Sequence, residues 1–476
     1  MVKDETPSFI RKNKKPQVVK HLNPAQILVS GFIILILIAS ILLMLPISSN
    51  SGEMTPFIDA LFTATSAVCV TGLVVVNTLA HWSLFGKIVI ICCIQIGGLG
   101  FMSLVSMIFV FLGRKITLKN RLIMQEALNA NTLAGVVRFT KIVVAGTLLV
   151  EGIGAFLLAF VFVPEYGLLK GSAYAIFHSI SAFCNAGFDL IGDSSLTPYV
   201  GNGLVNFTIC MLILLSGLGF YVWMDTYRMF ATKRKAPEHY TWKQAIGRLT
   251  LHTKLVWVIT AILFVSGILV IFVFEYNNPA TLGALTLKEK IYAAVFQSVS
   301  PRTAGFNTIP LADLTDTSKL YTLLLMFIGG SPAGTAGGIK TVTIGVLVLC
   351  VYNTIKGNEQ VVVFKKKIPF DIITRALTIV MIAGMVIGVV VGILSITEDF
   401  TFMEILFETV SAFATVGTTL GITPGLSVIG KITIIIVMFI GRLGPITMAV
   451  ALMVRHRDQE RNKVSIGYPE EKVMVG

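Results

Sequence analysis

Charged residues are scarce in this chain of 476 residues. They make up 13% of the sequence, about half the share found in soluble globular proteins. Hydrophobic residues make up 55%, and residues 27–45 and 88–112 contain no charge at all. Because a bilayer span needs roughly 20 apolar residues, the composition excludes a soluble globular protein. The apolar runs are continuous and do not alternate, which excludes a transmembrane β-barrel. We predict a polytopic membrane protein that is all α-helical.

The sequence also lacks the patterns of a disulfide framework, a metal site or an enzyme. All six cysteines lie within or beside apolar segments, without metal-ligand spacing. The segment Gly334–Thr341 resembles a phosphate-binding loop, but that motif needs glycine directly before Lys340, where Ile339 stands. We therefore expect a chain that is not an enzyme or an ATP-driven pump and that holds no cofactor.

Positive charge is concentrated in a few places. The chain has 38 Lys and Arg residues and a net charge of +13. Most of these residues lie between apolar hairpins or near the ends of the chain, in segments 1–21, 113–141, 228–254, 356–375 and 455–476. This distribution is typical of cytoplasmic segments of membrane proteins. We therefore expect a multi-pass protein in the lipid bilayer with both termini cytoplasmic, and no binding of nucleic acid.

A short segment that runs from serine to glycine recurs four times. The four copies end at Gly72, Gly187, Gly305 and Gly417, which are 115, 118 and 112 residues apart. A repeat of this length indicates one structural unit used four times. The chain has 42 glycines, so the prediction depends on these four being in register. Four such glycines predict a ring of backbone around one axis, which is how membrane proteins coordinate a bare cation.

Each unit contains a long apolar run, a short one and a second long one. The short runs cover residues 57–69, 172–184, 288–300 and 402–414, and a repeat glycine follows each within five residues. Runs this short are typical of re-entrant segments, and non-helical backbone at membrane depth must be buried or line a cavity. We expect eight transmembrane helices and four re-entrant pore helices around one central pore. The predicted order is a cytoplasmic tail 1–21, pore units 22–113, 138–231, 250–356 and 369–456, and a cytoplasmic tail 457–476.

The residues at and before each repeat glycine form the candidate selectivity filter. Glycine adopts the left-handed backbone that turns successive carbonyls toward an axis. A helix that ends within the membrane also presents its negative dipole to a cation. The candidate cation-binding residues are Val70, Thr71, Gly72, Asn185, Ala186, Gly187, Thr303, Ala304, Gly305, Thr415, Val416 and Gly417.

A glycine-rich stretch interrupts the last apolar run of the third unit. Five glycines and a proline between residues 329 and 340 are incompatible with a straight helix. We expect two half-helices joined by a movable loop below the filter that acts as a gate, with a merely kinked helix as the alternative. The candidate gating residues are Gly329, Gly330, Ser331, Pro332, Gly334, Gly337, Gly338, Lys340 and Arg442.

Several polar residues lie within or beside apolar runs. Arg442 lies deep in the last run, where a buried arginine is costly and usually functional. We expect it to donate to loop carbonyls, and a snorkelling arginine is the alternative. Arg302 is expected at the extracellular mouth or behind the third filter segment. Asp189 and Asn307 are candidates for attracting cations. Glu151 is expected to have a structural role, with its hydrogen bonds satisfied.

These motifs resemble those of the Trk/Ktr/HKT superfamily of potassium transporters. The resemblance is carried by Cys69–Gly72, Asn185–Phe188, Arg302–Asn307 and Thr415–Thr418. The 329–340 stretch is similar to that family's intramembrane gating loop, and Arg442 matches the arginine that faces it. The resemblance covers about residues 22–456 and is nearest to the bacterial Ktr-type membrane subunit.

The resemblance implies potassium uptake across the bacterial plasma membrane, with K+ held by backbone carbonyls of the filter. It implies a homodimer that docks on a cytosolic RCK-type ring of regulatory subunits (KtrA- or KtrC-like), which alone would bind nucleotide. Gly72 favours potassium, because serine at this place accompanies sodium selectivity in the plant branch. The alternatives are a sodium-selective or weakly selective monovalent cation channel or symporter of the same fold, and a polytopic membrane enzyme or receptor.

Overall fold

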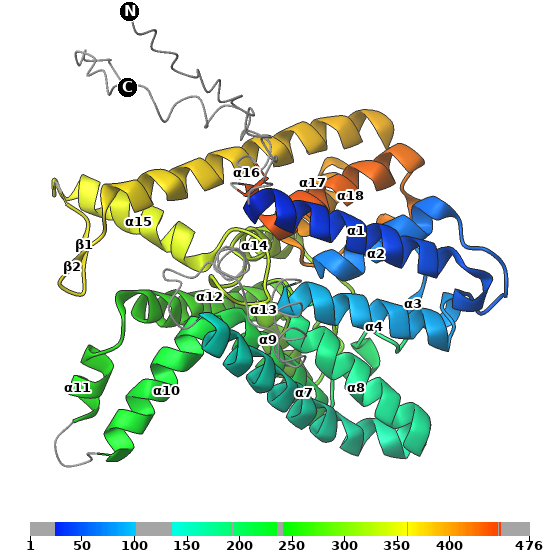
Figure 1. The fold of residues 1–476 in the computed structure, drawn as a ribbon, viewed down its shortest axis with the longest axis horizontal. Helices are drawn as coiled ribbons and strands as arrows, with labels where there is room; N and C mark the ends of the chain where they lie inside the picture. The colour runs from blue at the N-terminus through cyan, green and yellow to red at the C-terminus, as the bar shows by residue number, and fades with distance from the viewer. Residues whose placement is uncertain are drawn as a thin grey trace, which may run out of the picture.

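Helices make up most of the described chain (Figure 1). The structure is a computed structural model that describes residues 24–100, 136–192, 195–235, 241–358, 360–445 and 447–448. The predicted tails 1–21 and 457–476, and much of the basic segment 113–141, lie outside these residues. In the described part, strands occur only in one hairpin, formed by β1 (Val362–Val363) and β2 (Lys366–Lys367).

The main helices fall into four units, each with a long helix, a short helix and a final helix or helix pair. The first unit has α1 (Pro24–Met44), α2 (Phe57–Cys69), the one-turn α3 (Thr78–His81) and α4 (Leu84–Leu99). The second has α7 (Val136–Tyr166), α8 (Leu168–Cys184), α9 (Gly203–Leu218) and α10 (Phe220–Lys235). After α11 (Trp242–Gly247), the third has α12 (Leu251–Glu275), α13 (Leu287–Val299), α14 (Asp316–Phe327) and α15 (Thr341–Ile355). The fourth has α16 (Phe370–Thr397), α17 (Phe402–Ala414) and α18 (Val428–Leu443).

The first helix of each unit is long and apolar enough to cross a bilayer. This holds for α1, α7, α12 and α16. Large apolar side chains project outward from them, including Ile34 at 56% exposure, Leu149 at 66% and Met385 at 63%. Soluble monomers rarely expose extended apolar surface of this kind. The four helices therefore present a surface suited to lipid.

The final helix of each unit ends early or is broken. The sequence predicts a continuous run over 203–227, but this is wrong, because α9 and α10 meet at 94°. Gly219 lies at this break with φ +87, and a Cβ there would lie 2.5 Å from the carbonyl oxygen of Pro332. In the third unit, α14 and α15 are separate helices, so the predicted break is confirmed and the kinked-helix alternative is excluded.

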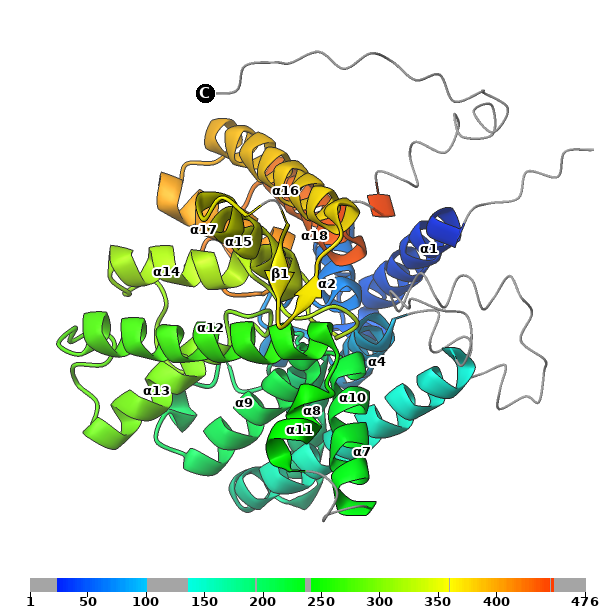
Figure 2. The same cartoon turned by 90° about the vertical axis from the view of Figure 1, so that its left-hand side faces the viewer.

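The four units pack in a closed ring. Each long helix contacts the short helix of its own unit, and each final helix contacts the short helix of the next unit. Figure 2 shows the first unit in blue beside the last in orange, with the second and third units completing the circle. The contacts between units are α4 on α8, α9 on α13, α14 on α17, and α18 on α2. The sequence repeat therefore corresponds to a fourfold arrangement in space.

The short helices α2, α8, α13 and α17 converge in the interior. Two begin with a capping box, formed by Thr286 with Glu289 and by Thr401 with Glu404, which satisfies backbone N–H groups that a helix start leaves free. Each helix then buries a phenylalanine completely: Phe62, Phe183, Phe296 and Phe407. Because the last turns of these helices are buried, the segments that follow them also start inside the protein.

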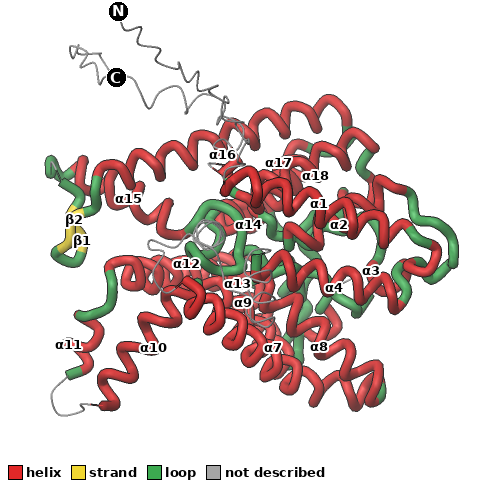
Figure 3. The backbone as a smooth tube through the Cα atoms, in the orientation of Figure 1, coloured by secondary structure: helices red, strands yellow, loops and turns green. Residues whose placement is uncertain are grey.

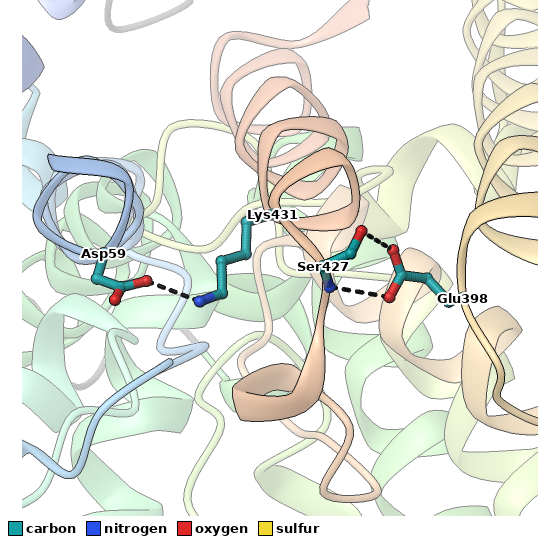
Figure 4. Close-up of polar contacts among 4 residues, drawn as sticks. All are labelled: Asp59, Glu398, Ser427 and Lys431. Carbon is teal, nitrogen blue, oxygen red and sulfur yellow. Dashed lines mark hydrogen bonds and ion pairs between the residues drawn. The ribbon is translucent and has the colours of Figure 1, made fainter. Parts of the chain in front are cut away.

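An ion pair joins the two ends of the ring. Lys431 on α18 lies 2.7 Å from Asp59 on α2, and their side chains are 15% and 17% exposed. Figure 4 shows this pair beside a second contact, in which the amide and hydroxyl of Ser427 donate to Glu398 at 2.9 and 2.5 Å. Ser427 also caps α18 through Gly430. These contacts position the first turn of α18 between α16 and α2.

Removing one partner of the Lys431–Asp59 pair should destabilise the ring. We expect Lys431→Met or Asp59→Asn to lower stability by about 1–3 kcal/mol, between the values for exposed and fully buried pairs. Thermal unfolding of the purified protein measures the effect. The exposed lysine variant Lys288→Gln on α13 is the matched control. A loss in the double variant equal to the sum of the two single losses would contradict a stabilising pair, because it leaves no coupling between Lys431 and Asp59.

Candidate functional site

The chain leaves helical conformation directly after each short helix. We call residues 70–72, 185–187, 303–305 and 415–417 the candidate filter segments. Val70, Asn185 and Thr415 have left-handed backbone, with φ of 57, 61 and 51°. The β-branched Val70 and Thr415 rarely adopt this conformation. Such strain persists only where surrounding structure fixes it, and it is found most often at functional sites.

The third candidate segment differs in detail. Its helix α13 ends at Val299, and the left-handed residue is Thr303, with φ 82°. The amide of Ala304 donates to the carbonyl of Ser300 at 2.9 Å. Pro301 stands between the helix and this turn, and proline has no N–H to continue the helical pattern. The third left-handed residue therefore comes four positions after the end of its helix, whereas in the other three units it comes directly after the helix.

The repeat serines connect each short helix to the segment after it. Ser66 and Ser411 accept hydrogen bonds from the amides of Gly72 and Gly417, at 3.0 and 3.1 Å. In the other two units the serine donates instead, from Ser181 to the carbonyl of Phe188 at 2.7 Å and from Ser300 to that of Phe306. The first and fourth units thus share one pattern, and the second and third share the other.

The four repeat glycines form a closed ring of backbone. A Cβ built on Gly72 would lie 3.2 Å from the Cα of Gly187, and one on Gly187 would lie 3.1 Å from that of Gly305. One on Gly305 would lie 3.3 Å from the Cα of Gly417, and one on Gly417 would lie 2.9 Å from that of Gly72. The atom nearest each such Cβ is a carbonyl oxygen from the adjacent unit, that of Ala186, Ala304, Val416 or Thr71. Side chains are therefore excluded here, and carbonyl oxygens alternate with glycines around the ring.

Two polar residues behind the ring were not predicted from the sequence. Glu408 on α17 is fully buried and accepts hydrogen bonds from Thr419 at 2.7 Å and Thr423 at 2.5 Å. His178 on α8 is also fully buried; its Nε2 accepts from the amide of Leu190 at 3.2 Å, and its Nδ1 lies 2.7 Å from a helix carbonyl. Both side chains hold the chain that follows a candidate filter segment.

A shared register could have identified these two residues. Each lies three positions before its repeat serine, and the matching positions in the other units are also polar, Thr63 and Gln297. A polar residue at the same place in all four short helices is a signal that only alignment of the repeats makes visible. The side-chain polar atoms of Thr63 and Gln297 have no hydrogen-bond partner among the described residues.

The loop between α14 and α15 lies against the ends of two short helices. Figure 3 shows this loop in green near the middle of the helices. The hydroxyl of Thr335 donates to the carbonyl of Phe183 in α8 at 3.1 Å. A Cβ on Gly337 would lie 2.8 Å from the carbonyl oxygen of Ala414 in α17. The loop is therefore directly beside two of the four candidate filter segments.

The same loop is attached to the break between α9 and α10. The amide of Ser331 donates to the carbonyl of Gly217, and the amide of Phe220 donates to that of Ala333, both at 2.9 Å. Lys340 donates to the loop carbonyl of Ala336 at 2.6 Å. This bond gives a lysine within an apolar segment a partner. The backbone groups released by the two breaks thus satisfy one another.

Arg442 joins this loop to the end of α4. Its guanidinium donates to the carbonyl of Thr335 at 2.6 Å and to the carbonyls of Gly97 and Gly98. Among the described residues, no carboxylate lies within ion-pair distance of it. Five N–H donors in a planar fork suit a set of converging carbonyls. Arg442 therefore contacts the loop, and the snorkelling alternative does not describe its position.

The remaining polar residues singled out from the sequence have local partners or are buried. Asp189 accepts from the amide of Ile191 at 3.1 Å, and Asn307 donates to the carbonyl of Ile309 at 3.1 Å. Glu151 is buried and accepts from Gln95 at 3.1 Å. Arg302 is 6% exposed, so it is not at an open mouth. The structure brings the four candidate filter segments together with the loop and Arg442, and leaves these other groups outside the ring.

A methyl group at a ring glycine should be far more harmful than one at a nearby open glycine. Gly417 and Gly421 both have positive φ, of +93 and +102°, but only Gly417 has backbone atoms of the adjacent unit within 4 Å. We expect Gly421→Ala to cost about 1–2 kcal/mol from backbone strain, and Gly417→Ala to lower the unfolding midpoint further or to prevent folding. Thermal unfolding of both purified variants tests this. Equal shifts would contradict the close packing of the ring.

Comparison with known proteins identifies a family over nearly the whole chain. Residues 4–463 match the TrkH family, described as cation transport protein. The chain is 41% identical to Ktr system potassium uptake protein B of Bacillus subtilis, over 97% of this chain and 99% of that protein. It is 40% identical to the potassium/sodium uptake protein NtpJ of Enterococcus hirae, over the same shares.

A solved structure has the same fold. The crystal structure of the potassium transporter TrkH from Vibrio parahaemolyticus matches 92% of this chain and 86% of that chain, with a TM-score of 0.69 and 22% identity. These similarities confirm the resemblance to the Trk/Ktr/HKT superfamily that the sequence motifs indicate. The chain therefore belongs to the TrkH family of cation transport proteins, and it is a membrane transport protein and not an enzyme.

Proposed function

We propose that this chain takes up potassium across the bacterial plasma membrane through a single pore in each protomer. The observation that carries the proposal is the closed ring of Gly72, Gly187, Gly305 and Gly417, in which each glycine meets a carbonyl oxygen of the adjacent unit. A ring of backbone carbonyls can replace the hydration shell of a potassium ion. The names of the relatives, potassium uptake protein B and potassium/sodium uptake protein, support the choice of ion.

In this proposal the carbonyls of the four candidate filter segments bind K+. The short helices act as pore helices, and their C-terminal ends converge on the ring. The partial negative charge of those ends favours a cation at the axis. The left-handed residues Val70, Asn185 and Thr415 and the serine contacts would fix the carbonyl positions without help from the ion.

The proposed membrane arrangement has eight spans and four re-entrant pore helices. The long helices α1, α7, α12 and α16 form the first span of each pore unit, and the broken or shortened final helices form the second. The units then cover residues 22–113, 138–231, 250–356 and 369–456, with both termini and the basic segments on the cytoplasmic side. The positive-inside distribution of Lys and Arg supports this orientation.

The membrane potential would drive the ion, since 100 mV is worth about 2.3 kcal/mol per charge. We propose that this chain itself needs no cofactor. Two chains would form a homodimer that binds a cytosolic RCK-type ring of regulatory subunits, and nucleotide would act only on that ring. The name Ktr system, given to the Bacillus relative, supports a transporter with more than one component.

Residues 329–340 would form the gate. The loop lies against the C-terminal ends of α8 and α17, next to the candidate filter, and Arg442 holds it through the carbonyl of Thr335. Glycines at 329, 330, 334, 337 and 338 leave the loop without bulky side chains, so it can move with little steric resistance. Opening would break the Arg442 contact and move the loop away from the axis.

One observation favours a second candidate function, a sodium-selective or weakly selective pore. The Enterococcus relative, 40% identical over 466 residues, is named for both potassium and sodium. The two functions share the same ring and differ in how closely the carbonyls fit each ion. Ion competition therefore separates them without any change to the structural account.

Potassium should compete with rubidium for uptake much better than sodium does. The test expresses this chain, with and without a cognate regulatory subunit, in a strain that lacks potassium uptake, and follows rubidium uptake. We also expect Gly72→Ser to move the preference toward sodium, because a Cβ there would clash with the carbonyl oxygen of Ala186 and would shift ring carbonyls away from their fit to potassium. Equal inhibition by both ions in the wild type would favour the weakly selective pore.

Deleting residues 331–338 should raise basal rubidium flux if the loop is a gate, because the remaining chain is too short to cover the axis.

Arg442→Gln should also raise basal rubidium flux, because it removes the contact between Arg442 and the carbonyl of Thr335. Arg375→Gln, at an exposed position on α16, is the matched control for charge. Unchanged flux in folded deletion protein would leave the loop with only a structural role.

A further inference from the structure

A chain of buried hydrogen bonds connects the loop to the second candidate filter segment. The hydroxyl of Ser216 donates to Oδ1 of Asn185 at 3.2 Å. Nδ2 of Asn185 donates to the hydroxyl oxygen of Thr335, also at 3.2 Å. That hydroxyl donates in turn to the carbonyl of Phe183. All three side chains are at most 1% exposed, so water cannot replace a bond that breaks.

Asn185 belongs to the filter backbone as well as to this chain of bonds. It ends α8 in left-handed conformation, two residues before Gly187. Asparagine tolerates that conformation better than most residues. Its side chain therefore extends from the ring toward the loop, where it meets Thr335. A movement of the loop that displaces Thr335 would leave a buried amide N–H without an acceptor, which is costly.

Thr335 makes two separate sets of contacts that hold the loop in place. Its side chain bonds to α8 and Asn185, and its carbonyl accepts from Arg442 at 2.6 Å. The equivalent positions in two other units make no such connection. Val70 is apolar, and the hydroxyl of Thr415 has no hydrogen-bond partner among the described residues. The second unit thus differs from the first and fourth in having a filter side chain that hydrogen-bonds to the loop.

We propose that the Asn185–Thr335 contact couples the loop to the filter, so that the two change together. Asn185 and Thr335 act as positioning residues: the loop, when seated, fixes the backbone of the second filter segment, and its departure loosens that segment. Coupling between two sites is reciprocal, so a cation bound at the ring also stabilises the seated loop. The effect of this coupling on transport rests on the proposed function. The coupling between the loop and the second filter segment depends only on the fold.

Hydrogen–deuterium exchange of the purified, bilayer-reconstituted protein tests the coupling without measuring transport. Thr335→Val keeps the side-chain shape and removes the hydroxyl. We expect it to raise exchange about fivefold in both residues 331–340 and 185–190, the change expected for one net hydrogen bond. Thr335→Ser, which retains the hydroxyl, should restore the wild-type pattern. Ser216→Ala breaks the other end of the chain and should raise exchange in residues 185–190.

Thr341→Val is the matched control. Thr341 is also fully buried, and its hydroxyl lies 3.0 Å from that of Ser331, but its side chain makes no hydrogen bond to a filter segment among the described residues. It should raise exchange in the loop alone. The coupling is overturned if Thr335→Val leaves residues 185–190 unchanged, or changes them no more than Thr341→Val does.

Rubidium uptake gives a second readout. We expect Thr335→Val to raise basal flux and to lower the ratio of potassium to sodium inhibition at least threefold, while Thr341→Val leaves that ratio unchanged. A wild type without cation uptake would overturn the proposed function, whereas the exchange result would still decide the coupling. A normal selectivity ratio in Thr335→Val, together with raised flux, would overturn the coupling and leave Thr335 as a gate contact only.

Discussion

The whole structure depends on one constraint: backbone that leaves the helical conformation inside an apolar protein must still find hydrogen-bond partners. Four short helices end in the interior, so their last carbonyls and the amides that follow have neither helix partners nor bulk water. The repeat serines bond to these segments, left-handed residues turn them, and four glycines let adjacent segments approach within van der Waals distance. The arrangement that provides these backbone contacts also brings carbonyl oxygens together around one ring.

A second level of broken backbone lies next to this ring. α4, α9 and α18 end at Gly100, Gly219 and Gly444, all with φ between 82 and 87°, and α14 gives way to the long loop. Arg442 satisfies carbonyls at the end of α4, and the amide of Ser331 in the loop satisfies one at the end of α9. In the proposed mechanism the first level binds the ion and the second controls access to it. The two levels meet at Thr335, where a change in one has a physical route to the other.

Much of this architecture follows from the sequence, because the repeat is visible there. The short helices begin and end within a few residues of the predicted runs, and the glycine content between residues 329 and 340 predicts the largest break. The break at Gly219 was missed, because one glycine in an apolar run is ordinary in membrane helices. Aligning Leu99-Gly100, Leu218-Gly219 and Leu443-Gly444 would have revealed it. His178 and Glu408 were missed because their partners, Leu190, Thr419 and Thr423, are distant until the chain folds.

The most direct test of the account is the location of the bound ion. Crystals of the protein grown in rubidium would be measured at the rubidium absorption edge, where the ion gives an anomalous signal. A carbonyl filter predicts a peak on the axis enclosed by Gly72, Gly187, Gly305 and Gly417, within coordination distance of backbone carbonyls from all four units. A peak held by side-chain carboxylates elsewhere, with none at the ring of a fully ordered protein, would contradict it.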